Sequence, residues 1–209
     1  SHNAIAVRAR IVGSCEKYDR QPDEITIVAV TKGFPAMTIR KAVENGFMHI
    51  GENRIQEAEP KITELGHIAT YHMIGHLQSN KAKKTVQLFD VIQSVDSLGL
   101  AEEINKHALA ANRKIECYIQ VNCSGEVQKS GVYPDNCLEL VKKTSKLYHI
   151  KLTGLMTIGP LTEDEQAIST AYAKCRELFQ EGQKIVGPQF EHLSMGMSDD
   201  YHLAIAEGS

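Results

Sequence analysis

Apolar and polar positions follow two alternating rhythms along this chain. Short runs of branched apolar residues, which indicate buried strands, occur seven times, and each is followed by a stretch with helical spacing. The sequence predicts strands at 25–31, 47–51, 71–75, 88–95, 114–122, within 150–159 and at 190–196. It predicts helices at 4–18, 35–46, 52–66, 78–88, 96–113, 134–148, 162–185 and 198–208. Pro60 indicates a kink or a break in the helix at 52–66, and Asp96 or Ser97 is expected to cap the helix that follows the fourth strand.

Strand–helix units in series predict parallel strands joined by crossover helices. An open doubly wound sheet and a closed (β/α)8 TIM barrel both fit this order. Polar or small residues recur where the strands end, at Thr31-Lys32, Glu52-Asn53, Gly75-His76, Ser94–Asp96, Asn122, Thr157 and Ser194. A barrel gathers such positions in one ring at its carboxyl-terminal face. A dinucleotide-binding sheet needs a GxGxxG turn, which "TKGFPA" at 31–36 does not match.

We therefore predict an α/β chain with the TIM-barrel fold, as a single domain over residues 1–209 with an extra N-terminal helix. The prediction is one strand short of a closed barrel. We expect the eighth strand to follow residue 209 in the full protein.

Composition narrows the functional classes. The chain is 42% hydrophobic and 23% charged, and its formal net charge of -3 gives no reason to expect nucleic acid or an anionic membrane as a partner. No apolar stretch approaches the roughly 20 residues of a membrane span, and the N-terminus has no signal-peptide pattern. The five cysteines include no CxxC pair, which argues against a disulfide framework or a zinc ribbon. These features predict a cytoplasmic protein.

Lys32 is the first candidate for chemistry. It ends the apolar run "IVAVTK" at 27–32, although lysine is rarely buried without a partner. A strand-end lysine in a barrel mouth can form a Schiff base with a carbonyl group of a substrate or of pyridoxal phosphate. The alternative is a lysine that extends to solvent or pairs with an acidic residue such as Glu52.

The segment "HLSMGMSDD" at 192–200 is the second candidate. Its strand is expected to end at Ser194, and Ser198 or Asp199 to open a helix, so that backbone N–H groups of the turn bind an anion. The loops after strands seven and eight commonly hold phosphate in barrels, and they lie next to strand one. Lys32 facing a phosphate-binding turn fits pyridoxal phosphate.

The histidines do not indicate a metal site. His72 and His76 have an HxxxH spacing, but Gly75 ends the strand between them, so they lack the helical geometry of a zinc site. We expect no metal, and His72 is expected to be a hydrogen-bonded residue of the barrel. The sequence also contains no Gx4GK[ST] or GxSxG motif and no cysteine–histidine nucleophile signature.

Several segments together resemble the YggS/PROSC family, the pyridoxal phosphate homeostasis proteins. They are "VAVTKGFP" at 28–35, "HIGENRIQEA" at 49–58, "YHMIGHLQSNK" at 71–81, "QSVDS" at 93–97, "VNCSGEVQKSGV" at 121–132, "LTGLMTIG" at 152–159 and "HLSMGMSDDYHLAI" at 192–205. The resemblance implies a barrel like the N-terminal domain of alanine racemase, in the fold-type III class of pyridoxal phosphate proteins. It implies that Lys32 carries pyridoxal 5′-phosphate as a Schiff base. It also implies a set of further cofactor-binding residues: Asn53 beside the cofactor, His72, Met73, Met156 and Thr157 in the pocket wall, and Ser194, Met195 and Gly196 at the phosphate.

The resemblance further implies a role in storing and delivering the cofactor, without catalytic residues and without robust catalysis. The expected partners are pyridoxal phosphate and apo forms of enzymes that use it, and the expected state is a monomer. Two alternatives stay open. An amino-acid racemase needs a second acid–base group opposite Lys32, which related racemases take from a second domain that we do not expect in this chain. A Schiff-base aldolase without a cofactor is the other.

Overall fold

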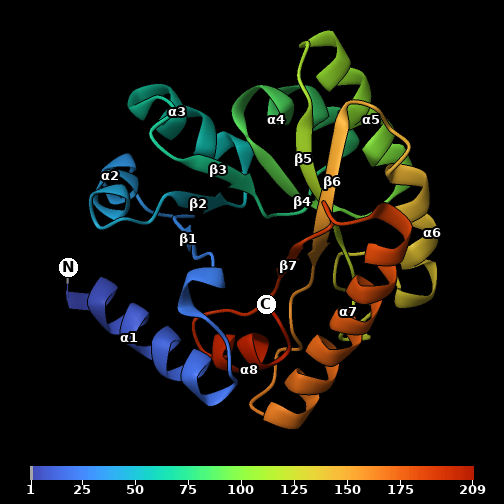
Figure 1. Ribbon diagram of the computed structural model, residues 1–209. Helices are drawn as coiled ribbons and strands as arrows, with labels where there is room; N and C mark the ends of the chain where they lie inside the picture. Colours follow the sequence, from blue (N-terminus) through green and yellow to red (C-terminus); the bar gives the residue numbers. More distant parts are fainter. Residues whose placement is uncertain (1) are drawn as a thin grey trace.

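The computed structural model describes residues 2–209, and in this range seven strands alternate with helices (Figure 1). The strands are β1 (Val28–Val30), β2 (His49–Glu52), β3 (Thr70–Met73), β4 (Val91–Val95), β5 (Ile115–Gln120), β6 (Ile150–Met156) and β7 (His192–Ser194). The α-helices are α1 (His2–Lys17), α2 (Ala36–Glu44), α3 (Ile55–Leu65), α4 (Ala82–Leu88), α5 (Leu98–Ala110), α6 (Pro134–Thr144), α7 (Glu165–Val186) and α8 (Tyr201–Ala206). Two single 3-10 turns lie at Pro22–Glu24 and Ser79–Lys81.

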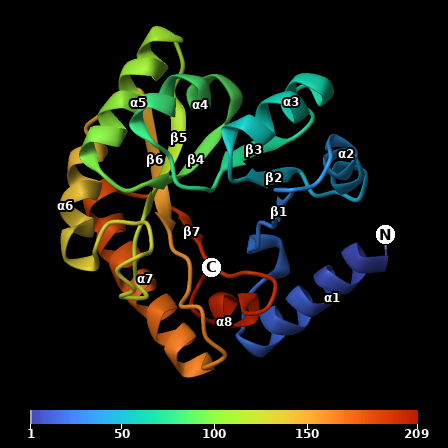
Figure 2. The same cartoon turned by 180° about the vertical axis from the view of Figure 1, so that it is seen from behind.

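The strands form one parallel sheet in the order β1-β2-β3-β4-β5-β6-β7. A doubly wound sheet would reverse its order at a switch point, so this sequential order excludes that alternative. The sheet curls, and α2 to α7 lie outside it in both views (Figures 1 and 2). The barrel architecture predicted from the sequence is confirmed, as is the extra N-terminal helix α1.

Within residues 2–209, β1 and β7 are the two edges of the curled sheet. Helices α1 and α8 lie together beside the space between these edges, and the end of the described chain lies there too (Figures 1 and 2). The hydroxyl of Ser209 donates to the carbonyl oxygens of Leu193 and Met195 at 3.2 and 2.7 Å. Arg20 donates to the carbonyl oxygen of Ser209 at 2.6 Å. These bonds attach the last residue to β7, to the turn that follows it and to Arg20.

The predicted elements form, and several of their ends differ. Strand β1 is only Val28–Val30, shorter than the predicted 25–31. Helix α3 continues through Pro60, so of the predicted kink or break the break is wrong. Ser97, one of the two predicted caps, accepts a hydrogen bond from Leu100 N at the start of α5. Helix α8 begins at Tyr201, later than the predicted start at Ser198 or Asp199.

Burial follows from the layers of the fold. Every residue of β4 is buried, because its neighbours in the sheet, the outer helices and the barrel interior surround it. The main core lies between the sheet and the helices and includes Ile39, Ile92 and Tyr172. Among residues 2–209, no helix combines the length and the apolar character needed to cross a membrane.

Candidate functional site

A cavity of about 370 Å³ opens at the carboxyl-terminal ends of the strands. Its size lies within the range common for small-ligand sites. The structure brings seven of the nine predicted cofactor-binding residues to its wall: Lys32, Asn53, Met156, Thr157, Ser194, Met195 and Gly196. These residues come from the ends of β1, β2, β6 and β7 and the turns that follow them.

Lys32 lies in a tight turn between β1 and α2. Thr31 N continues the ladder by donating to Gly51 O at 3.0 Å, and Phe34 N donates to Thr31 O at 3.1 Å. Gly33 has a φ of 75°, in the left-handed region that favours glycine. The side chain of Lys32 is exposed and forms no ion pair with the residues that the structure describes.

The neighbouring helix α3 fixes this turn from the side. Lys61 Nζ donates to Thr31 O at 2.8 Å and pairs with Glu52 at 2.8 Å. Glu57 Oε2 accepts from Gly33 N at 2.9 Å. The hydroxyl of Thr31 also donates to Glu52, so Glu52 already has two buried partners. The proposed pairing of Lys32 with Glu52 is therefore not found, and the amine of Lys32 is left available.

Asn53 follows directly after Glu52 and lines the cavity beside the β1 turn. Gly75 is required behind it, because a Cβ atom there would lie 2.1 Å from Asn53 O. The glycine thus lets the ends of β2 and β3 approach closely, which places Asn53 at the wall.

The turn after β7 forms the opposite wall. Gly196 has a φ of 98°, and a Cβ atom there would lie 2.7 Å from the Cβ of Ala204. Asp200 closes the turn by accepting from Met197 N at 2.7 Å. The backbone therefore passes Ser194, Met195 and Gly196 along the cavity before α8 begins.

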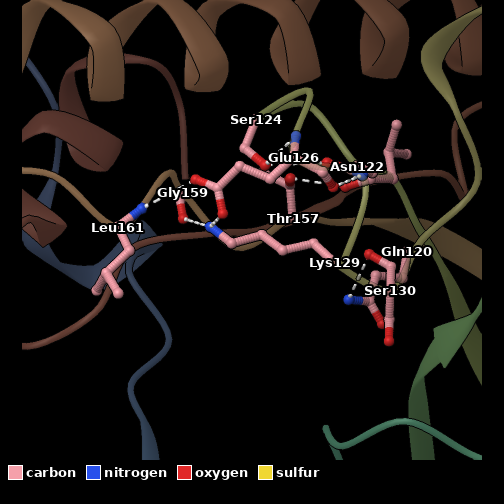
Figure 3. Close-up of polar contacts among 10 residues, drawn as sticks. Gln120, Asn122, Ser124, Glu126, Lys129, Ser130, Thr157, Gly159 and Leu161 are labelled. Atoms are coloured by element: carbon pink, nitrogen blue, oxygen red, sulfur yellow. Dashed lines mark hydrogen bonds and ion pairs between the residues drawn. The ribbon is translucent and has the colours of Figure 1, made fainter.

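The remaining wall is built after β5 and β6 (Figure 3). Thr157 donates its hydroxyl proton to Val121 O at 2.7 Å, which joins the ends of these strands. Lys129 Nζ donates to Gly159 O at 2.7 Å and pairs with Glu126 at 3.1 Å. Figure 3 shows that Lys129 spans the space between the two loops, so the loop after β5 is attached to the loop after β6.

Two predicted residues do not line this cavity. Met73 lies in the core between the sheet and the helices, at 2% exposure. His72 points into the barrel below the cavity, where it contacts His49 and Gln93. For Met73 the reason is the two-residue period of a strand, which sends its side chain to the face opposite that of His72. His72 faces the barrel interior, but at a level below this cavity. Of this stretch, Ile74, Gly75 and His76 reach the cavity wall instead.

Sequence reasoning did not single out Gln93, Gln120, Lys129 and Ser130, which also line the cavity. Gln93 and Gln120 are polar residues inside largely apolar strand runs, "VIQSV" and "CYIQV". That pattern is a signal for a polar group facing a barrel interior. Lys129 and Ser130 lie in a long loop, whose path the periodicity does not predict.

A second cavity of about 290 Å³ lies at the amino-terminal ends of the strands. It is lined by His49, His72, Glu116 and His192, among others. It shares Val28, Gln93 and the turn at Ser194–Gly196 with the first cavity. Burial is the largest influence on His72 and lowers its pKa to about 3, with the neighbouring His49 acting in the same direction. Within residues 2–209, no group of three or more His, Cys, Asp or Glu side chains is arranged to hold a metal ion.

Comparison with known proteins gives consistent relationships. The family model for the alanine racemase N-terminal domain matches residues 17–208. A pyridoxal phosphate homeostasis protein of Aquifex aeolicus is 38% identical over 97% of this chain and 90% of its own length.

Solved structures agree with these sequence matches. The structure of PipY from Synechococcus elongatus with pyridoxal phosphate bound has 36% identity and a TM-score of 0.80, covering 97% of this chain and 94% of that one. A protein of unknown function from Bifidobacterium adolescentis has 35% identity and a TM-score of 0.92, covering 99% and 88%.

Proposed function

We propose, since this chain belongs to the family of pyridoxal phosphate homeostasis proteins, that it binds pyridoxal 5′-phosphate and takes part in the storage and delivery of this cofactor. The single observation that carries the proposal is the cavity whose wall includes both Lys32 and the turn at Ser194–Gly196. The amine of Lys32 has no ion-pair partner within residues 2–209. The bound cofactor supplies an aldehyde that condenses reversibly with amines.

The residues present fit this group. A lysine without a partner suits the aldehyde end, because its amine is free to act as a nucleophile. A glycine-containing turn with a positive φ lets the backbone approach a phosphate closely. The cavity also has more apolar than polar character near Val28, Val30 and Ile74, which suits a flat ring.

We propose that attachment is a Schiff base at Lys32. The neutral Nζ attacks the aldehyde carbon, a C=N bond forms, and the aldehyde oxygen leaves as water. Asn53 and Thr157 border the site from β2 and β6, and the turn at Ser194–Gly196 receives the phosphate. Helix α3 holds the β1 turn through Lys61 and Glu57 and so keeps Lys32 directed at the cavity.

The proposed role is that of a carrier and not an enzyme. The matched relatives are named for homeostasis and not for a reaction. A racemase would need a second acid–base group opposite Lys32, and no tyrosine lines the cavity among the described residues. Measurable interconversion of D- and L-amino acids by the pure protein would contradict the carrier role.

We propose that residues 1–209 act as one cofactor-binding barrel domain, since one apolar core extends over its strands and helices. We also propose a monomer in the cytoplasm that passes its cofactor to apo enzymes. The exposed amine of Lys32 supports delivery, because an incoming amine can reach the same carbon.

The test uses absorbance and unfolding together. Pyridoxal phosphate should give the parent protein a visible absorption band, and reduction with borohydride should fix it to the peptide that contains Lys32. Lys32→Ala should abolish the band, whereas Lys41→Ala, a lysine of α2 outside the cavity, should retain it. A saturating cofactor should also stabilise the parent by about 3 kcal/mol at 100 times its Kd. A colourless parent protein after incubation would contradict the proposed function.

A further inference from the structure

A chain of four side chains connects the two cavities through the barrel interior. Ser194 Oγ donates to Gln93 Oε1 at 2.6 Å, and Gln93 Nε2 lies 2.9 Å from His72 Nδ1. His72 Nε2 lies 2.9 Å from His49 Nδ1. Ser194 ends β7 at the first cavity, at the carboxyl-terminal ends of the strands, which we call the upper cavity. His49 begins β2 at the second cavity, at the amino-terminal ends, which we call the lower cavity. Gln93 is 2% exposed and His72 is 3% exposed, so water does not compete for the inner bonds.

In this arrangement every hydrogen bond points the same way. The amide nitrogen of Gln93 can only donate, so His72 Nδ1 accepts. Neutral His72 then carries its proton on Nε2 and donates it to His49 Nδ1. The low pKa of His72 that results from burial is consistent with the neutral ring. The order of donation is therefore Ser194 to Gln93 to His72 to His49.

This direction conflicts with phosphate binding by the Ser194 side chain. A hydroxyl has one proton, and that of Ser194 is donated to Gln93. If the proton turned to a phosphate alone, the buried Oε1 of Gln93 would lose its donor, which would weaken binding by about tenfold. The loss is avoided if the amide of Gln93 turns over, so that Nε2 donates to Ser194 Oγ and Oε1 accepts from His72 Nδ1.

We propose that the chain Ser194–Gln93–His72–His49 reverses its direction of donation when a phosphate group occupies the turn at Ser194–Gly196. Gln93, His72 and His49 are thus positioning residues that act through Ser194. This inference rests on the proposed function, since it concerns the same phosphate subsite. In the reversed chain His49 donates to His72, His72 carries its proton on Nδ1, and Ser194 has its proton free for the phosphate.

The reversal makes the lower cavity sensitive to occupancy of the upper one. His49 must supply a proton from Nδ1 in the reversed state, so its own tautomer or charge changes with phosphate binding. Burial has the largest effect on His49 and lowers its pKa; Glu116 from β5 acts in the opposite direction, and His192 from β7 lowers the pKa further. Whatever alters His49 in the lower cavity should in turn alter phosphate retention, because coupling between two sites is reciprocal.

The experiment measures the histidine tautomers directly. Two-bond proton–nitrogen correlation spectra of protein labelled with 15N-histidine distinguish a ring proton on Nε2 from one on Nδ1. Without ligand, His72 should carry its proton on Nε2. With pyridoxal phosphate the proton should shift to Nδ1, and with pyridoxal, which has the aldehyde but no phosphate, it should stay on Nε2. Absorbance on the same samples reports whether the aldehyde has reacted.

Two variants test whether the hydrogen-bonded series of side chains, and not the general structure, controls the tautomer of His72. Ser194→Ala removes the hydroxyl, and Gln93→Met interrupts the chain with a side chain of similar length. Both should bind pyridoxal phosphate more weakly than the parent, because both residues line the cavity. At cofactor concentrations high enough to restore the absorption band, His72 should no longer change its tautomer. If the parent protein develops the absorption band and His72 keeps its proton on Nε2, the inference is wrong while the proposed function stands. If no band develops, the proposed function fails and the inference fails with it.

Discussion

Two lysines near the end of β1 have opposite environments. Lys32 is exposed and unpaired among the described residues, whereas Lys61 is 8% exposed and bonded to Glu52 and Thr31. The sequence points to Lys32 because it interrupts an apolar strand end. Nothing in the helical pattern of 52–66 distinguishes Lys61, whose burial depends on a partner 9 residues earlier in the chain.

The buried ion pair of Lys61 and Glu52 predicts a large loss of stability when one partner is removed. Lys61→Met should lower the free energy of unfolding by about 3 to 5 kcal/mol, because the buried carboxylate of Glu52 loses its counter-charge. Adding Glu52→Gln should restore a large part of the loss. Urea unfolding measures both variants, and Lys84→Met is the matched control, since its pair with Glu59 is exposed and worth about 0 to 1 kcal/mol. Equal losses for Lys61→Met and Lys84→Met would contradict a buried, tightly coupled pair.

The burial of His72 in its neutral form predicts that the folded protein loses stability in acid. Burial lowers its folded-state pKa to about 3, below the ordinary value of 6.5, so between these values the unfolded chain binds a proton that the folded protein does not. Stability therefore falls as the pH drops from 6.5 towards 3, by on the order of 3 kcal/mol at pH 4. Urea unfolding from pH 7 to 4 should show a shallower decline for His72→Gln than for the parent. His67→Gln, which changes an exposed histidine, is the control and should lose stability as steeply as the parent protein.

At the scale of elements, the sequence predicts the order and type of the strands and helices because their apolar periods are clear. It does not predict their ends where long-range contacts decide them. The turn after β7 delays α8 to Tyr201 because Asp200 bonds to Met197 N, a contact that periodicity cannot reveal. The motif around Met73 indicates a place in the pocket wall, but the alternation along β3 puts this side chain in the outer core.

Strands β6 and β7 approach so closely at Gly154 that one added methyl group there should lower the stability of the fold. A Cβ atom at Gly154 would lie 1.9 Å from His192 O, so Gly154→Ala should destabilise the protein by at least about 2 kcal/mol. Gly99 in α5 has open space around it and ordinary helical geometry. Gly99→Ala should therefore stabilise by about 0.5 kcal/mol. Thermal unfolding compares the two, and similar melting temperatures would show that the strands separate easily to admit the methyl group.

Across the whole molecule, the sheet is most enclosed at its centre. All residues of β4 are buried, whereas β1 contains none that are, and Val30 is 44% exposed. The barrel type could be predicted because polar residues recur at the strand ends. The gradient of burial could not, because it depends on which strands have two neighbours in the described part of the chain.

The gradient predicts an order of hydrogen exchange. Amide protons of β4 and β5 should exchange slowest, and those of β1 and β7 fastest among the strands, because the edge strands open at a smaller free energy than the centre. Exchange followed by mass spectrometry on peptides from each strand measures this order. Pyridoxal phosphate should slow exchange most at 28–34 and 192–197, the segments that border the cavity. Uniform protection of all seven strands would contradict the gradient.

The sequential strand order has a kinetic consequence. Within residues 2–209, each strand pairs only with its neighbours in the chain, so every new pairing closes a loop of about one strand–helix unit. The entropy lost in closing a loop grows with its length, and chains rich in short-range pairings fold faster than chains that must join distant segments. We therefore expect the sheet to nucleate near β4 and β5 and to grow outward in similar steps. Lys32 and Ser194, at opposite ends of this growth, would be the last to meet, so the cavity would form only when folding is nearly complete.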